Sequence, residues 1–266
     1  MLRLLRTDCS TNAKWRVGKR GRERNVDASV KLFYYYFMRI QKYLSEQGVC
    51  SRREAEDLIK RGLVALNGVV VREMGVQVDP MRDKVTVLPS GQREIAGKQS
   101  IILYKPRGIT SSRIKSEGRN VYDLFPQFEN LDIVGRLDKA SEGLLLLSDD
   151  GVIAKAVTGE AHAVEKEYEV TVREETNAGR LKKLEPGIIL EDGPTLPCQT
   201  KLIGPHRFRI IIREGRKHQI RRMCEFLHLT VVQLRRLRIG SITLGDLKPG
   251  AFRPLTEYQI ASLKGK

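Results

Sequence analysis

The sequence contains few of the residues that build disulfide frameworks and metal sites. Its 266 residues include four cysteines and four histidines, and no two cysteines form a Cys-x-x-Cys pair. No pair of histidines has the spacing of metal ligands. So few cysteines in so long a chain argue against a disulfide framework and indicate a reducing compartment. We therefore expect no metal site and a cytoplasmic location.

Long apolar runs and nucleotide-binding loops are also missing. No apolar run approaches the length of a membrane span. The most apolar N-terminal stretch, residues 30–38, contains Lys31 and is not followed by a small-residue cleavage signal. The sequence has neither a Gly-x-x-x-x-Gly-Lys-Ser/Thr motif nor a well-placed Gly-x-Gly-x-x-Gly motif. These absences predict no membrane span, no signal peptide and no cofactor.

Negative charge is scarce relative to positive charge. The chain has 48 Lys and Arg against 32 Asp and Glu, which gives a formal net charge of +16. This imbalance favours a polyanionic partner, nucleic acid first and an anionic membrane surface second. A membrane-surface protein would concentrate its charge on one amphipathic basic helix. Because the charge is instead spread over the whole chain, we favour nucleic acid.

The first 37 residues differ from the rest of the chain. They hold nine Lys or Arg against three Asp or Glu and show no clear apolar period. Composition alone fits a disordered RNA-binding arm or an organelle transit peptide. An upstream extension from a misassigned start codon fits equally well, because an organised pattern begins only at Met38. We therefore treat residues 1–37 as a basic extension.

Residues 38–97 show the pattern of a small α+β module. Apolar residues from Ile40 to Leu44 have helical spacing. Ser51-Arg52-Arg53-Glu54 predicts a capping box at the start of a second helix. Asn67-Gly68, between two apolar runs, predicts a β-hairpin with a type I′ turn. Short strands are then expected at 76–78 and 84–87, and a polar linker at 89–98.

Residues 98–266 predict a larger α+β domain. An apolar strand at 101–104 and an alternating strand at 165–172 frame the centre of this region. The uncharged run Leu144–Leu147 predicts a strand that is buried on both faces. A further strand is expected at 208–212, followed by a helix whose apolar face consists of Ile220, Met223, Phe226 and Leu227. Between Arg207 and Arg238 there are ten Lys or Arg and only two acids, the densest basic stretch in the chain.

The most informative stretch runs from Gly135 to Gly143 and directly precedes the leucine run. Asp138 lies between Arg136 and Lys139 on a loop bounded by glycines. A carboxylate on such a loop is held firmly and can still be reached from solvent. An isolated aspartate at such a position is usually only a turn residue. The whole string Gly-Arg-Leu-Asp-x-x-Ser-x-Gly followed by four leucines is much more specific than the aspartate alone.

This stretch resembles the catalytic motif of the RNA pseudouridine synthases, in the RsuA-like branch that modifies ribosomal RNA. The resemblance implies that Asp138 is the essential catalytic residue. Glu165–Tyr168 contains the family's Lys-x-Tyr unit, which implies that Tyr168 is the residue that stacks on the target base or accepts a proton. Gly215–Arg221 matches the third motif, Gly-Arg-x-His-Gln-Ile-Arg, which implies that Arg221 pairs with the catalytic aspartate.

The resemblance extends to RNA binding. The predicted order of elements in 38–87 is similar to that of the S4 RNA-binding domain, in which basic side chains at a helix start meet phosphates. We expect RNA contacts from ten basic residues, which are Arg52, Arg53, Lys60, Arg61, Lys105, Arg107, Arg136, Arg216, Lys217 and Arg222. Residues 162–168 and 221–225 are more similar to the large-subunit type RluF than to other branches.

These patterns together predict an α+β protein in two domains after the basic extension. A small S4-like RNA-binding domain with its linker (38–97) precedes a pseudouridine synthase domain (98–266) with a mixed, mostly antiparallel sheet. The implied function is isomerisation of uridine in ribosomal RNA by a monomer without metal or cofactor. We expect the target to be the 23S large-subunit rRNA. A non-catalytic ribosome-assembly factor on the same fold would explain the charge, but it does not require Asp138, Tyr168 and Arg221 together.

Overall fold

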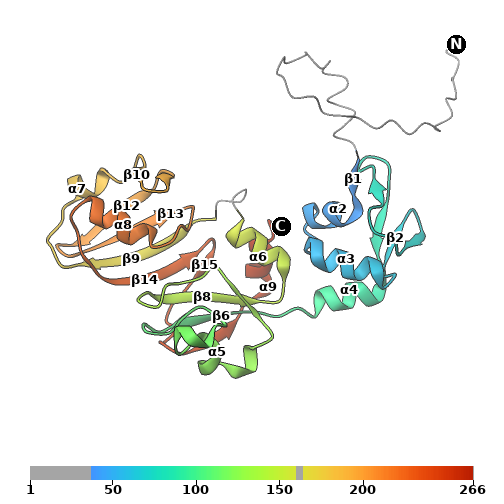
Figure 1. The fold of residues 1–266 in the computed structure, drawn as a ribbon, viewed down its shortest axis with the longest axis horizontal. Coiled ribbons are helices and arrows are strands. Elements are labelled where there is room, and N and C mark those ends of the chain that lie inside the picture. Colours follow the sequence, from blue (N-terminus) through green and yellow to red (C-terminus); the bar gives the residue numbers. More distant parts are fainter. Residues whose placement is uncertain (1–36, 160–163, 266) are drawn as a thin grey trace, which may run out of the picture. The chain divides into compact units, whose positions relative to one another are not determined.

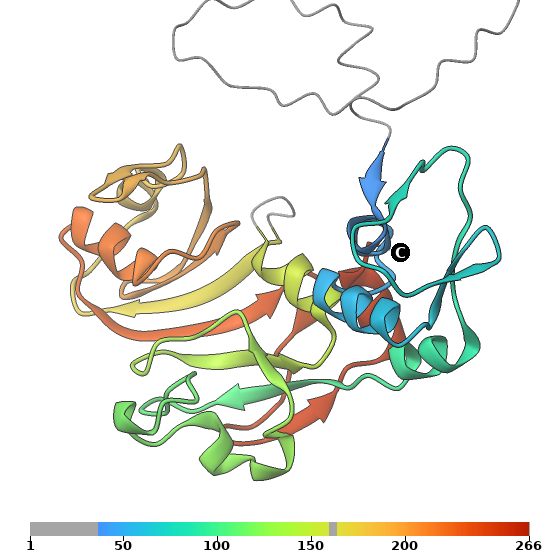
Figure 2. The same cartoon turned by 45° about the vertical axis from the view of Figure 1, so that its right-hand side comes forward.

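The computed structural model describes residues 37–159 and 164–265. The expectations for residues 1–36 and for the part of 162–168 that precedes Val164 lie outside these residues. From Phe37 onward the chain forms one compact unit, shown in two views in Figures 1 and 2. In the described part of the chain, no helix has both the length and the apolar character needed to cross a membrane.

The N-terminal region, residues 37–97, contains the two predicted helices and the predicted short strands. Helix α2 spans Ile40–Glu46 and α3 spans Arg52–Lys60. The strands are β1 (Met38–Arg39), β2 (Val64–Leu66), β3 (Val69–Val71), β4 (Gln77–Val78) and β5 (Val85–Val87). They pair in the order β3-β2-β5, with β1 and β4 as a separate pair. Apolar residues of both helices and of β2, β4 and β5 form the core of this region.

Two local predictions in this region are confirmed in detail. The Ser51 hydroxyl accepts the Glu54 N–H at 3.3 Å, and the Ser51 N–H donates to the Glu54 carboxylate at 2.6 Å, which completes the capping box. Asn67 and Gly68 both have positive φ, 51° and 84°. A type I′ turn requires positive φ at both central positions, so these two residues determine the hairpin.

The predicted linker is wrong in one respect, because Pro89–Ala96 forms helix α4. Proline suits the first turn of a helix, where its missing N–H is not needed. Position 91 inside this helix favours glycine, because a Cβ there would lie 2.8 Å from the Val87 side chain. The composition of the segment predicted a loop, but close packing of α4 against β5 explains both the helix and its glycine.

The C-terminal region is built on a nine-stranded sheet. Its strands run in the order β12-β13-β9-β14-β8-β6-β16, with β7 paired to β8 and β15 paired to β14. Among the described strands of this sheet, only the β14–β8 pair is parallel, and the other pairs are antiparallel. The strands are β6 (Ser100–Lys105), β7 (Asp132–Val134), β8 (Glu142–Ser148), β9 (Lys166–Val172), β12 (Gln199–Gly204), β13 (Arg207–Ile212), β14 (Val231–Ile239), β15 (Ile242–Thr243) and β16 (Phe252–Pro254). The predicted mixed, mostly antiparallel sheet is confirmed.

Helices cover both faces of the sheet at β8. Leu145 and Leu147 join a core with residues of α5, α7 and α8, whereas Leu144 and Leu146 join a core with residues of α6 and α9. The helices are α5 (Val121–Leu124), α6 (Gly151–Thr158), α7 (Ala178–Lys182), α8 (Gln219–Phe226) and α9 (Glu257–Leu263). Both views show α6 and α9 side by side. The leucine run is therefore buried on both faces, as predicted.

Smaller elements complete the C-terminal region. They are the 3-10 turns η1 (Lys115–Glu117) and η2 (Pro126–Phe128) and the strand pair β10 (Ile189–Leu190) and β11 (Gly193–Pro194). One predicted core residue is wrong, since Phe226 is 52% exposed. The buried positions of α8 are Gln219, Ile220, Met223 and Cys224, and Phe226 falls outside the stripe that they define.

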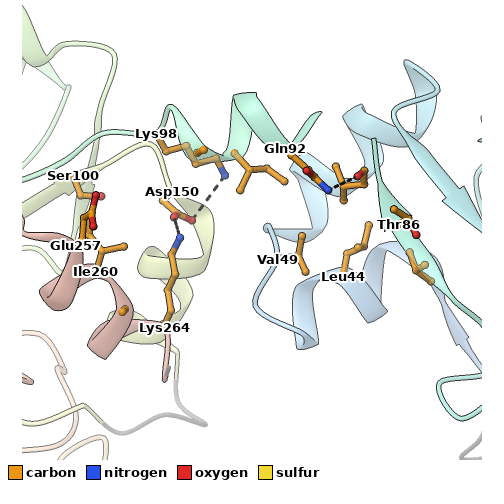
Figure 3. Close-up of a pocket in the computed structure, with 15 residues that line it drawn as sticks. Leu44, Val49, Thr86, Gln92, Lys98, Ser100, Asp150, Glu257, Ile260 and Lys264 are labelled. Carbon is orange, nitrogen blue, oxygen red and sulfur yellow. Dashed lines mark hydrogen bonds and ion pairs between the residues drawn. The ribbon is translucent and has the colours of Figure 1, made fainter. Parts of the chain in front are cut away.

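The N-terminal and C-terminal regions meet at a cleft (Figure 3). It is lined by apolar residues of α2 and β5 and by polar residues that include Lys98, Asp150 and Lys264. Asp150 caps α6 and pairs with Lys264 at 2.6 Å and with Lys98 at 3.8 Å. Lys98 also pairs with Glu54 of α3. These ion pairs connect the segment after α4 to both regions.

Candidate active site

The Asp138 loop joins β7 to β8 and is anchored on the inside of the molecule. Leu137 is buried in the core, and its N–H donates to the Ser111 hydroxyl at 3.3 Å. The Asp138 carbonyl accepts the Ser141 N–H at 3.0 Å, which turns the chain toward β8. The Asp138 carboxylate is left 37% exposed. The loop therefore holds a reachable carboxylate on a firmly attached backbone.

The residues that approach Asp138 come from the start of α8. His218 Nε2 lies 3.6 Å from Asp138 Oδ1. The Arg221 guanidinium donates to the carbonyl of Ala140 at 3.2 Å and to that of Val231 at 3.4 Å. The implied ion pair between Arg221 and Asp138 is not formed, although both residues lie in the described part of the chain. Arg221 contacts the same loop two residues further on, because its side chain spans the gap between the loop and β14.

Sequence reasoning missed His218 as a member of this site. The residue has a left-handed backbone, with φ of 53°, at the position just before α8 begins. Positive φ is uncommon outside glycine and points to a structural or functional constraint. The signal was present in the sequence, since His218 belongs to the Gly-Arg-x-His-Gln-Ile-Arg motif. A histidine without metal-ligand spacing gave no further reason to select it.

Lys105 does not occupy the position expected of a phosphate contact. Its side chain is completely buried. The ammonium donates to the carbonyl oxygens of Pro106 at 2.9 Å and of Ile109 at 2.7 Å. Burial lowers the pKa of Lys105 to about 8, although the nearby charges of Glu142 and Asp138 act in the opposite direction. The prediction of an RNA contact is therefore wrong, since Lys105 lies at the end of β6 and points inward.

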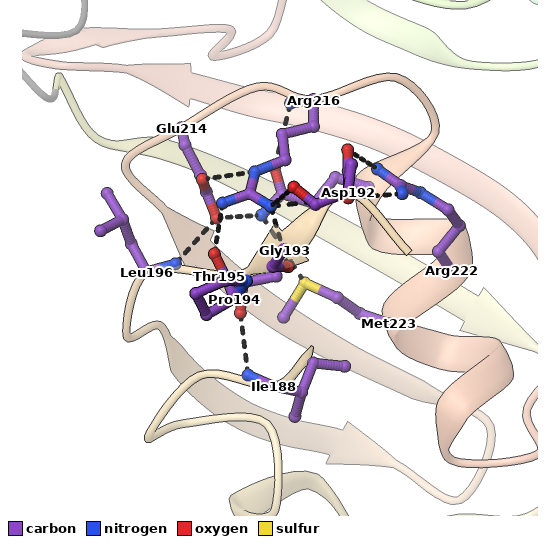
Figure 4. A network of polar contacts seen from close by, with 11 residues as sticks. Ile188, Asp192, Gly193, Pro194, Thr195, Leu196, Glu214, Arg216, Arg222 and Met223 are labelled. Carbon is purple, nitrogen blue, oxygen red and sulfur yellow. Dashed lines mark hydrogen bonds and ion pairs between the residues drawn. The ribbon is translucent and has the colours of Figure 1, made fainter. Parts of the chain in front are cut away.

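Arg216 and Arg222 are also engaged within the protein (Figure 4). Arg216 donates to Glu214 at 3.0 Å and to the carbonyl of Gly193 at 3.0 Å. Arg222 forms two parallel hydrogen bonds with the Asp192 carboxylate, at 2.8 and 2.9 Å. These bonds lower the pKa of Asp192 to about 2. The two arginines hold the β10–β11 hairpin against α8, so their charges are already engaged within the protein, and their RNA contacts stay a prediction.

Much of the dense basic stretch is neutralised in the same way. Arg235 pairs with Glu169, and Arg238 pairs with Glu165 and Glu167. In the N-terminal region the exposed Arg61 pairs with Asp57 and Glu94, and its RNA contact stays a prediction. The sequence counted these charges but could not show that strand pairing brings glutamates of β9 beside the arginines of β14.

Seven predicted RNA contacts lie on the surface. They are Arg52, Arg53, Lys60, Arg61, Arg107, Arg136 and Lys217, of which Arg61 is engaged in ion pairs. Of these, Arg107 donates to the carbonyl of Val232 at 3.1 Å, which ties its loop to β14. Arg136 is two residues from Asp138 and Lys217 is adjacent to His218. Exposed cations therefore lie on both segments that form the site.

Tyr168 lies in the middle of β9, where it is 7% exposed and packs in the larger core. It is in register with Arg236 of β14, which is in turn in register with Gly143 of β8. The pairing thus places Tyr168 in the same row of the sheet as Gly143, which lies at the start of β8 just after the Asp138 loop. Among the described residues, no three His, Cys, Asp or Glu side chains are grouped so that they could hold a metal ion.

Comparison with known proteins identifies the family. A family model described as RNA pseudouridylate synthase matches residues 99–226, and an S4 domain model matches residues 38–83. The chain is 36% identical over 241 residues to the ribosomal large subunit pseudouridine synthase B of Bacillus subtilis, covering 85% of this chain and 95% of the relative. The chain therefore belongs to the RsuA-like RNA pseudouridine synthases with an N-terminal S4 domain, and it is an enzyme of that class.

Two further similarities bear on the branch and the fold. The dual-specificity RNA pseudouridine synthase RluF of Escherichia coli K12 is 36% identical over 230 residues, covering 85% of this chain and 78% of the relative. A solved structure titled as that of a pseudouridylate synthase is 30% identical, with a TM-score of 0.61, covering 85% of this chain and 99% of that chain. The percentage identity is the same for the Bacillus enzyme and for RluF, so it does not separate the two types.

Proposed function

We propose that this enzyme converts uridine to pseudouridine in the ribosomal RNA of the large subunit, with Asp138 as the reacting carboxylate. The observation that carries the proposal is the position of Asp138, a 37% exposed carboxylate on a loop that is anchored through Leu137 and faces the start of α8. The name of the Bacillus relative, a ribosomal large subunit pseudouridine synthase, supports a ribosomal target. Such a target would place the reaction in the cytoplasm.

The reaction requires no group donor and no net redox change. The N1–C1′ bond of the nucleotide breaks, the base turns, and a C5–C1′ bond forms. C5 then loses its proton and N1 gains one, so the atoms balance within the nucleotide and solvent. An ionised carboxylate next to the sugar can serve this reaction as a nucleophile or as a base. We assign that role to Asp138, and to His218 and Arg221 the role of holding substrate or loop beside it.

The base must leave its stack before its bonds can be exchanged. Tyr168 is the proposed aromatic partner of the displaced base, as a stacking group or proton acceptor. RNA loops and bulges present bases that can be splayed out in this way. The exposed cations Arg136 and Lys217 flank the site and are proposed to bind phosphates there, whereas Arg52, Arg53 and Lys60 are proposed to bind flanking RNA. We propose that the enzyme acts as a monomer.

The substrate assignment is tested with two RNAs that carry tritium at C5 of uridine. Deproteinised large-subunit and small-subunit rRNA are incubated separately with the full chain, and the released tritium is counted. We expect release from the large-subunit RNA alone. Release only from the small-subunit RNA would contradict the assignment to the large subunit. Release from neither RNA, although both bind, would contradict the proposal for free rRNA.

A further inference from the structure

Arg236 is an arginine in the interior of the molecule that has no carboxylate partner. It lies in the middle of β14 and is 1% exposed. Among the residues that the structure describes, no carboxylate forms an ion pair with it. A buried charge is costly unless it is well hydrogen-bonded. The contacts of this guanidinium therefore need an explanation.

The guanidinium is satisfied by backbone carbonyls on both sides of the Asp138 loop. Its Nη2 donates to Gly135 at 2.8 Å and its Nη1 lies 3.5 Å from the carbonyl oxygen of Arg136. Its Nε donates to Leu144 at 2.7 Å. Gly135 and Arg136 precede Asp138, whereas Leu144 follows it in β8. One side chain thus connects the segment that enters the loop to the segment that leaves it.

The backbone of Arg236 approaches the same loop at a second point. A Cβ on Gly143 would lie 2.3 Å from the Arg236 carbonyl oxygen, and Gly143 has a φ of 105°. Both features require glycine there. The parallel pairing of β14 with β8 is limited to two residue pairs, one of which is Arg236 with Gly143. The ladder between the two strands is short, so the side-chain bonds of Arg236 form a large part of the connection.

The surroundings explain why this position needs an arginine. Lys105 and Lys166 are also buried, and burial, together with the charge of Arg236, lowers the pKa of both amines. A guanidinium stays charged throughout the pH range of proteins and presents five donors in a planar fork. It can therefore bridge carbonyls on two segments, which the ammonium of a lysine at this depth could do less well.

We propose that Arg236 is a positioning residue of the reaction, which holds the loop from Gly135 to Leu144 so that the Asp138 carboxylate is presented to the nucleotide at a fixed place. This inference rests on the proposed role of Asp138. Arg236 itself is buried and does not touch the substrate. Its removal should slow the bond exchange on bound RNA and leave RNA binding unchanged, because the exposed cations of the surface are untouched.

Arg238 offers a matched control on the same strand. It makes three hydrogen bonds, to Glu165 at 3.2 Å, to Glu167 at 3.0 Å and to the carbonyl of Gly240 at 2.8 Å, and none to the Asp138 loop. The two glutamates keep partners in Arg213 and Arg209 when Arg238 is removed. The substitutions Arg236→Met and Arg238→Met therefore each delete three side-chain bonds from β14, but only the first releases the loop.

The test compares the full-length wild type, Arg236→Met and Arg238→Met with tritiated rRNA as the probe. Single-turnover rate constants at saturating enzyme, dissociation constants for the RNA and amide hydrogen exchange of residues 135–144 are measured at a temperature at which all three are folded. A misplacement of about 1 Å can cost about 100-fold in rate, so we expect a loss of that order for Arg236→Met with unchanged affinity. Exchange at the loop amides, including that of Ser141, should rise in this variant alone.

Equal rate losses in the two methionine variants, or a wild-type rate for Arg236→Met, would overturn the positioning role. If Arg236→Met does not fold, Arg236→Lys is measured in its place. It keeps the charge but cannot reach all three carbonyls, and we expect a loss of at least about tenfold from the same misplacement. An Asp138→Asn variant is measured in parallel. Full activity of that variant would defeat the proposed function, whereas its inactivity beside a fully active Arg236 variant would defeat only this inference.

Discussion

The buried ammonium of Lys105 predicts an unusual dependence of stability on pH. The pKa of Lys105 falls from 10.5 to about 8 on folding because its side chain is buried. The folded state therefore releases this proton at a lower pH than the unfolded chain does. Below pH 8 the lysine is charged in both states and the folded protein carries the full cost of its burial. Between pH 8 and 10.5 the unfolded chain binds more protons, so the contribution of Lys105 makes the protein more stable as pH rises.

The size of this effect follows from the shift in pKa. A change from 10.5 to about 8 is about 2.5 pKa units, which at 1.36 kcal/mol per unit corresponds to about 3 kcal/mol of unfolding free energy. The substitution Lys105→Met removes the titration and keeps most of the side-chain volume. It also leaves the carbonyls of Pro106 and Ile109 without their donor. That loss does not depend on pH, so it changes the unfolding free energy of the variant by the same amount at every pH.

Three cysteines that are buried in the described part of the chain make a direct pH scan of the wild type ambiguous. Burial raises the pKa of Cys50 and Cys198 to about 11 and that of Cys224 to about 12. Raised thiol pKa values lower stability as pH rises above 9, which opposes the contribution of Lys105. Both proteins contain these cysteines, so the difference between wild type and Lys105→Met isolates the lysine.

The assay is urea unfolding of both proteins from pH 7 to pH 10.5. The stability of the wild type relative to the variant should increase by up to about 3 kcal/mol across this range. A difference that stays constant with pH would refute the conclusion that Lys105 is buried with a lowered pKa. It would also restore Lys105 to the set of residues available for phosphate contact.

Two further predictions concern Asp192, which binds the arginines beside the β10–β11 hairpin, and Tyr168. Asp192→Asn removes the carboxylate that binds Arg222 and Arg216, so we expect a lower melting temperature. The two released arginines should bind phosphates, which gives tighter rRNA binding and a steeper fall of affinity with salt. An unchanged salt slope in filter binding would show that the arginines stay engaged within the protein. Tyr168→Phe should keep the single-turnover rate, because the buried ring is the expected contact with the base, whereas Tyr168→Leu should lower it. A large loss for Tyr168→Phe would instead identify the hydroxyl as a proton acceptor.

Local sequence signals predicted most of the elements because the physics that specifies them is local. The capping box at Ser51, the Asn67-Gly68 turn and the uncharged leucine run each act within a few residues. Helix α4 was missed because the sequence around Gly91 has the composition of a loop. The glycine is needed for packing against Val87, and this tertiary contact cannot be recognised from the local sequence. Strand β14 was also missed, since its arginines gave it the composition of a basic surface.

The contacts around Asp138 could not be predicted from the sequence motifs. The motif placed Asp138 and Arg221 in one site, yet only the structure shows His218 beside the carboxylate and Arg221 on the Ala140 carbonyl. Charges were the weakest part of the prediction. Whether an arginine is available to bind RNA depends on strand register and on carboxylates that are distant in the sequence, as Arg222 and Arg238 show. The residues next to an arginine in the sequence reveal neither the register nor these carboxylates.

The central claim is that the Asp138 carboxylate performs the isomerisation. The most direct test measures tritium release from 5-³H-uridine rRNA by the wild type, Asp138→Asn and Asp149→Asn. Asp149 provides a matched control because it lies beyond the other end of β8, where its carboxylate accepts the Gln99 N–H at 2.8 Å. We predict release by the wild type and by Asp149→Asn, and none by Asp138→Asn although that variant still binds the RNA. Release by Asp138→Asn at the wild-type rate would contradict the account.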